Sequence, residues 1–173
     1  MKILVVYASK YGSSRGIAEF IAEKLRHRGK QVEVREVLAA RDVSGYDAFI
    51  IGSAVFFGSW MNEAAEFVRR NRSVLAERPV WLFSSGPLLS DTPLDDPKLE
   101  PKEAAEFREA IKPRDHRIFF GAFDHTKLGF RDRMITKLPA AKALFQEGDF
   151  RNWKDIEAWA NSIDQALEAP LPQ

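Results

Sequence analysis

The feature that most constrains the fold lies in Met1–Arg28. Ile3–Tyr7 is an unbroken apolar run without charge, which is typical of a strand buried on both faces of a parallel sheet. From Ile17 to Leu25 the apolar side chains recur with the spacing of one helix face. The segment between them is a hydroxyl-rich turn of Ser9, Lys10, Tyr11, Gly12, Ser13 and Ser14. The chain therefore begins with a buried strand, a short turn and a helix N-terminus.

This turn has the chemistry of a phosphate-binding site. The first N–H groups of a helix lack backbone partners, and the helix dipole favours an anion beside them. The serine hydroxyls add donors, and Gly12 lets the backbone approach a ligand closely. The turn lacks the Lys-Ser/Thr ending of an ATP-binding P-loop and the G-x-G-x-x-G pattern of a dinucleotide site. An ordinary Ser/Gly helix cap is the alternative, and the position directly after the first strand favours phosphate binding over it.

The composition narrows the chemistry that the chain can perform. The absence of cysteine excludes disulfides, thiolate metal sites, iron–sulfur clusters and thiol redox catalysis within this chain. His27, His116 and His125 show no metal-ligand spacing, so we expect surface residues and no metal site. The net charge of +1 does not favour a nucleic-acid partner. No apolar run approaches the ~18 residues of a membrane span, and the first segment is a strand rather than a signal peptide, so we expect a cytoplasmic protein.

Strand and helix patterns alternate along the rest of the chain. Strands are predicted at 3–7, 31–37, 48–52, 79–83 and 117–123, and helices at 13–28, 62–75, 102–111 and 153–167, with Asp149 as a candidate cap of the last helix. Pro87–Pro101 is rich in proline and predicts a long loop, and Pro139 interrupts the helical pattern of Leu128–Phe145. This alternation predicts one α/β domain over 1–173. Its doubly wound, five-stranded parallel sheet has the order 2-1-3-4-5 or 3-2-1-4-5 and helices on both faces.

In either order a ligand binds beyond the carboxyl ends of the strands, where the turns after the first, third and fourth strands meet. The turn after the third strand has three aromatic residues. A flavin ring is flat, apolar on its faces and polar at one edge, so such a turn suits it. Core packing is the alternative for any one of these rings. The residues predicted to hold the ring here are Ser53, Ala54, Val55, Phe56, Phe57, Gly58 and Trp60.

The turn after the fourth strand completes the predicted site. It consists of Ser84, Ser85, Gly86, Pro87 and Leu88, and it has no aromatic residue. Either Leu88 or the loop Pro87–Pro101 covers the outer face of the ring, or that face is open to a flat substrate. A plain turn without a ligand is the alternative.

The segment Ser9–Ser14 resembles the flavodoxin phosphate loop, T/S-x-T-G-x-T/S, with Tyr11 where the family often has Thr. Together with the strand and helix order, it makes the chain similar to the flavodoxin family over nearly its whole length. That resemblance implies the strand order 2-1-3-4-5, FMN as the cofactor and an oxidoreductase function. FMN is then held by the residues named in the three turns.

Later blocks are more specific than the phosphate loop. They are Gly52–Gly58, Phe120–Phe123, Arg131–Leu138, and Asp149 followed by Trp153. Within the family they resemble the menaquinone-dependent protoporphyrinogen IX dehydrogenases, which implies a small-molecule substrate and a quinone acceptor. The basic segment Lys127–Lys142 then meets an anionic partner, either substrate carboxylates at Lys127, Arg131 and Arg133 or a membrane face, unless it is the solvated face of a helix.

A flavodoxin-type carrier, which passes electrons between protein partners, is the alternative function. Such carriers are strongly acidic, whereas this chain has a net charge of +1. A flavodoxin-like binding module without flavin is a third hypothesis, which the phosphate turn disfavours. The sequence contains no convincing acid/base pair, so no catalytic side chain is predicted and the chemistry belongs to the flavin.

Overall fold

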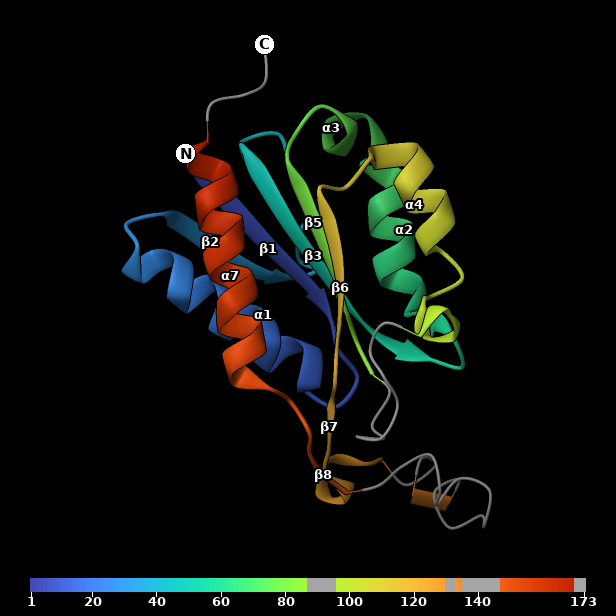
Figure 1. Ribbon diagram of the computed structural model, residues 1–173. Helices are drawn as coiled ribbons and strands as arrows, with labels where there is room; N and C mark the ends of the chain where they lie inside the picture. Colours follow the sequence, from blue (N-terminus) through green and yellow to red (C-terminus); the bar gives the residue numbers. More distant parts are fainter. Residues whose placement is uncertain (87–95, 130–132, 135–146, 170–173) are drawn as a thin grey trace.

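A parallel sheet separates two layers of helices (Figure 1). The computed structural model describes residues 1–86, 96–129, 133–134 and 147–169. The sheet order is β2 (Gln31–Glu36), β1 (Lys2–Ala8), β3 (Ala48–Phe56), β5 (Val80–Ser85) and β6 (Asp115–Phe119). All four pairings between these strands are parallel. Counted along the chain, the five strands have the order 2-1-3-4-5, which confirms the predicted fold class.

The two faces of the sheet explain the unbroken apolar run of the first strand. On one face, α1 (Ser13–His27) and α7 (Trp153–Glu168) pack over Ile3 and Val5. On the other face, α2 (Asn62–Arg70), α3 (Arg72–Ala76) and α4 (Ala104–Ile111) pack over Leu4 and Val6. Each of these four strand residues is 0% exposed. Both faces of the sheet are therefore shielded from solvent at this strand, and the side chains that point alternately to the two faces are all apolar.

Two boundaries differ from the sequence prediction. The helix expected at 62–75 is broken at Asn71, whose side-chain Nδ2 donates to the carbonyl of Phe67 at 2.8 Å. Such local side-chain bonds compete with the regular helix pattern. The last helix is capped by Asn152, whose Oδ1 accepts from the amide of Asp155 at 3.2 Å. The predicted cap at Asp149 is therefore wrong, and that carboxylate binds the guanidinium of Arg151 instead.

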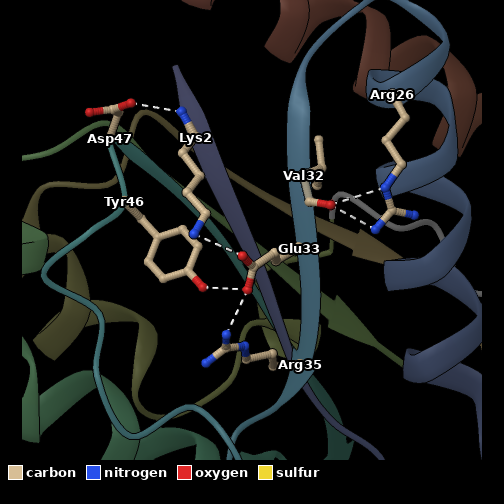
Figure 2. Close-up of polar contacts among 7 residues, drawn as sticks. All are labelled: Lys2, Arg26, Val32, Glu33, Arg35, Tyr46 and Asp47. Carbon is tan, nitrogen blue, oxygen red and sulfur yellow. Dashed lines mark hydrogen bonds and ion pairs between the residues drawn. The ribbon is translucent and has the colours of Figure 1, made fainter.

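The edge strand β2 is held to its neighbours by polar contacts at the end of the sheet opposite the turns (Figure 2). Glu33 accepts from Lys2 Nζ at 2.8 Å, from the Tyr46 hydroxyl at 2.6 Å and from Arg35 Nη2 at 2.6 Å. The Lys2 ammonium, the Tyr46 hydroxyl and the Arg35 guanidinium lower the pKa of Glu33 to about 2. Charged side chains along an edge strand also oppose pairing with a further chain.

Short elements extend beyond the carboxyl ends of the main strands, at the lower end of Figure 1. The strand β4 (Ser59–Trp60) pairs antiparallel with the end of β3 and forms a hairpin. The strand expected at 117–123 stops at Phe119, and β7 (Ala122–Phe123) pairs antiparallel with β8 (Gly148–Asp149). The turn η1 (Pro97–Leu99) lies between β5 and α4 in the sequence, and the turn η2 (His125–Lys127) follows β7. Within the described residues, none of the helices has the length and apolar character of a membrane span.

Candidate functional site

A cavity of about 290 Å³ opens where the segments after β1, β3, β5 and β6 meet. It lies at the carboxyl ends of the parallel strands, where the sequence predicts a ligand. Of the predicted residues, the lining contains Ser9, Tyr11, Ser13, Ala54, Val55, Phe56, Phe57, Gly58, Ser85 and Gly86. Lys98 and Leu99 also line the cavity, and they belong to the loop Pro87–Pro101 that the sequence offered as a cover for the ring, whereas Gly121, Ala122 and Phe123 were not predicted as site residues. Two predicted residues, Pro87 and Leu88, lie outside the described part of the chain.

The phosphate-loop candidate contributes Ser9, Tyr11 and Ser13 to the lining of this cavity, and Gly12 borders the neighbouring groove. Gly12 is the N-cap of α1 and has a φ of +91°, a conformation that residues with a side chain rarely adopt. Its amide donates to Ser9 Oγ at 3.0 Å, which closes the turn. Ser13 Oγ lies 3.0 Å from Ser85 Oγ and accepts from the amide of Ala122 at 2.9 Å. This one hydroxyl therefore connects the first turn to the segments after β5 and β6.

The first turn of α1 has an unsatisfied polar atom. Ser14 is 0% exposed, and its Oγ has no hydrogen-bond partner among the described residues. A buried hydroxyl without a partner is rare and calls for a ligand or water. The first turn contains no acidic residue that would offset the positive end of the helix dipole. A phosphate group at this position would accept from hydroxyls and helix N–H groups, so the residues present fit the phosphate of FMN.

The β3–β4 hairpin forms an aromatic wall. Phe57 stands at its tip with a φ of +51° and a side chain that is 84% exposed. The ring of Tyr11 makes edge-to-face contacts with Phe56 and Phe123, at centroid distances of 6.1 and 5.6 Å. Lys10 Nζ lies 5.2 Å from the centroid of Tyr11. These rings suit the apolar face of a flavin.

Gly86 lies at the end of β5 beside the hairpin, and its backbone conformation rather than the available space favours glycine there. Its φ is +128°, and a Cβ at this position would lie 3.5 Å from the carbonyl oxygen of Val55. The amide of Gly86 donates to the carbonyl of Phe119 at 2.9 Å, which fixes the end of β5 against β6. The backbone of Gly86 is therefore available along the cavity, whereas any side chain here would be strained.

Three predicted ring-binding residues have a different place. Trp60 is 3% exposed and packs edge-to-face on Phe107 of α4 at 5.2 Å, so it belongs to the core and not to the lining. Its Nε1 donates to Ser84 Oγ at 2.8 Å. Ser53 Oγ donates to the carbonyl of Ala54 at 2.8 Å and accepts from the amide of Met61 at 3.0 Å. Trp60, Ser53 and Ser84 therefore support the hairpin from outside the cavity lining, and direct contact of these three residues with a flavin stays a prediction.

His116 on β6 joins this buried network, contrary to the expected surface position. Its Nε2 lies 2.8 Å from Ser84 Oγ. The Ser84 hydroxyl accepts from Trp60 Nε1, and its own proton can be donated to His116 Nε2 when that nitrogen is unprotonated. Burial lowers the pKa of His116 and so favours the neutral ring. No pattern in the sequence indicates this contact, because it joins residues on adjacent strands. The described residues contain no cluster of carboxylates and histidines that could hold a metal ion.

Comparisons with known proteins agree with this geometry. Residues 4–144 match the family described as Flavodoxin domain. The chain is 24% identical to protoporphyrinogen IX dehydrogenase [quinone] of Escherichia coli K12, over 98% of each chain. A flavodoxin variant from Pseudomonas aeruginosa has a similar structure, with a TM-score of 0.64, 13% identity and coverage of 98% of this chain and 100% of that one.

A larger protein contains the same fold. The rubredoxin oxygen:oxidoreductase of the anaerobe Desulfovibrio gigas superposes with a TM-score of 0.63 and 16% identity over 96% of this chain. The match spans only 36% of that protein. The family match covers most of this chain, and the site contains a helix N-terminus with an unsatisfied hydroxyl beside an aromatic cavity. This chain therefore belongs to the flavodoxin domain family, with the oxidoreductase character and the FMN cofactor which that membership implies.

Proposed function

We propose that the chain is an FMN-dependent dehydrogenase that oxidises protoporphyrinogen IX and reduces a quinone. The observation that carries the proposal is the chemistry of the cavity. Its described lining is largely apolar and aromatic, and Lys98 is the one charged residue among the described lining residues. A flat, apolar tetrapyrrole with carboxylate side chains is complementary to such a cavity. The similarity to the E. coli enzyme, which extends over 98% of both chains, supports the same choice.

The chain's own residues bind and orient the reactants. The amide of Lys98 donates to Asp96 Oδ1 at 2.9 Å, which fixes η1 beside the cavity. From there the ammonium of Lys98 pairs with a substrate carboxylate. Phe56 and Phe57 exclude water from the reacting face. Bound FMN supplies the redox chemistry, in which each two-electron oxidation of the porphyrinogen releases two protons and converts one quinone to a quinol.

Quinones are lipid-soluble, so the proposal includes contact with a membrane surface from the cytoplasmic side. Phe57, with 84% of its side chain exposed, stands beside the cavity and is the residue that we expect to touch lipid. Lys98 is also exposed and suits an anionic surface. Of the cations predicted to meet the substrate, Arg131 lies outside the described residues.

The test uses FMN-loaded protein with protoporphyrinogen IX and a menaquinone analogue in detergent, without oxygen. Formation of porphyrin is followed by its fluorescence. We expect turnover that depends on both the protein and the quinone. In Lys98→Glu, KM should rise about tenfold with little change in kcat, because a contact of about 1.4 kcal/mol acts on ground and transition states alike. Lys112→Glu is the matched control, because this exposed lysine follows α4 at the opposite end of the sheet.

The same assay separates the enzyme from a flavodoxin-type carrier. A carrier gives no porphyrin but is reduced rapidly by a flavoprotein or ferredoxin reductase. Reduction by the reductase alone would therefore contradict the proposed activity. Equal KM values for Lys98→Glu and Lys112→Glu would contradict the role of Lys98 even if turnover is observed.

A further inference from the structure

A lysine from a distant part of the sequence reaches the N-terminus of α1. Lys127 Nζ lies 3.6 Å from the position that a Cβ on Gly12 would occupy, and it is the nearest atom to that position outside the turn. Gly12 is the N-cap of α1, at the centre of the phosphate loop. Lys127 therefore lies beside the phosphate loop rather than beside the aromatic wall, where the flavin ring is expected.

The backbone holds Lys127 in this place. Asp124 Oδ1 accepts from the amide of Thr126 at 2.9 Å and from its hydroxyl at 2.6 Å, which caps the turn η2 that ends at Lys127. The next residue, Leu128, is 5% exposed and anchors the far side of the turn. The near side is fixed by the bond from the amide of Ala122 to Ser13 Oγ. The Lys127 ammonium therefore lies beside the phosphate loop on a segment that hydrogen bonds and a buried leucine hold in place.

The electrostatics at this point favour an anion. A cation beside the positive end of a helix dipole is unfavourable by itself. Within the described chain, Lys127 forms no ion pair, and Ser14 Oγ, buried in the same first turn, has no partner. Carboxylates do border the groove of about 340 Å³ that Lys127 shares with Gly12, namely those of Asp124, Glu147 and Asp149. Asp124 is bound to Thr126, Asp149 is bound to Arg151, and Glu147 is exposed to solvent. Asp124 acts on Lys127 electrostatically, but among the described residues none of the three carboxylates forms an ion pair with it.

We propose that Lys127 is a phosphate-binding residue of the FMN site, with its ammonium as the counter-charge to the phosphate on the first turn of α1. Lys10, although it belongs to the loop itself, directs its ammonium to the rings of Tyr11 and Phe56, at 5.2 and 6.0 Å. The charge that selects FMN over the uncharged riboflavin therefore comes from outside the loop. The inference rests on FMN binding and holds whichever substrate the enzyme oxidises.

The test compares FMN with riboflavin, which has the same ring and ribityl chain but no phosphate. Dissociation constants are measured by quenching of flavin fluorescence with apoprotein. In Lys127→Met we expect Kd for FMN to rise about tenfold, equivalent to about 1.4 kcal/mol, and Kd for riboflavin to change less than about twofold. Salt should weaken FMN binding to the wild type and have a smaller effect on Lys127→Met. Lys127→Arg should keep FMN affinity within about threefold of the wild type, because the charge is retained.

The exposed Lys112 again provides the matched control, since Lys112→Met removes the same charge at the other end of the sheet. Lys127 is itself exposed, so its replacement leaves the core intact. Equal FMN affinities of Lys127→Met and Lys112→Met would overturn the proposal, as would an equal loss of FMN and riboflavin affinity. Failure to oxidise protoporphyrinogen, with FMN binding as expected, would contradict the proposed substrate and leave the role of Lys127 supported.

Discussion

Gly52, in the middle of β3, is the position where the structure predicts the sharpest response to a single methyl group. A Cβ added at Gly52 would lie 1.9 Å from Cζ and 2.1 Å from Cε1 of Phe83 on the neighbouring strand. Heavy atoms in ordinary contact are about 3.5–4.0 Å apart, so Gly52→Ala requires one of the two residues to move.

Neither residue has room to do so. Gly52 is paired on both sides, with Tyr7 of β1 and Phe83 of β5, so the strand cannot shift alone. The ring of Phe83 is 0% exposed and packs against Phe119 and Trp159, at centroid distances of 6.4 and 6.3 Å. Overpacking of a core typically costs about 1–3 kcal/mol. We expect the upper end, about 3 kcal/mol of unfolding free energy, which corresponds to a fall in Tm of roughly 6–12 °C for a chain of this size.

Urea denaturation and thermal unfolding measure this change. Gly45→Ala is the control, because nothing lies within 4 Å of the Cβ that it adds. Phe83→Leu in the Gly52→Ala background should recover about 2 kcal/mol, since the two sites share one space. A loss below about 1 kcal/mol in Gly52→Ala, or strictly additive effects in the double variant, would refute the steric argument.

Three further predictions concern the site. Gly12→Val should weaken FMN binding more than about tenfold in a fluorescence titration, because φ at this position is +91° and the valine side chain would point toward Lys127. An unchanged FMN affinity would show that the phosphate binds elsewhere. Phe57→Gly should raise the unfolding free energy by about 0.5–1 kcal/mol, because glycine tolerates the positive φ and the lost side chain is 84% exposed. The same variant should bind FMN more weakly. A fall in unfolding free energy would disprove the strain at Phe57. Because burial lowers the pKa of His116, the folded state favours the neutral ring. This contribution to the unfolding free energy is present above the unfolded-state pKa of about 6.5 and is lost as pH falls through the lowered folded-state pKa. Parallel profiles of unfolding free energy against pH for the wild type and His116→Gln would contradict this.

The fold follows from local patterns in the sequence. Buried parallel strands need apolar residues on both faces, and Ile3–Tyr7 and Ala48–Ile51 meet that condition without reference to any partner. The turn between the first strand and α1 is also a local feature, since the donors of a helix N-terminus and a glycine with positive φ lie within six successive residues, Ser9–Ser14. The family resemblance and its cofactor follow from these segments.

The composition of the site was decided by tertiary contacts. An aromatic residue at the end of a strand looks the same in a sequence whether it faces a ligand or the core. Trp60 is in the core because Phe107 of α4 and the hydroxyl of Ser84 meet it there, whereas Phe57, three residues earlier, has no such cover and is 84% exposed. Lys127 reaches Gly12 only because β7 docks on Ser13 through Ala122. These contacts join residues that lie far apart in the chain, so periodicity and spacing, which act over a few residues, contain no information about them.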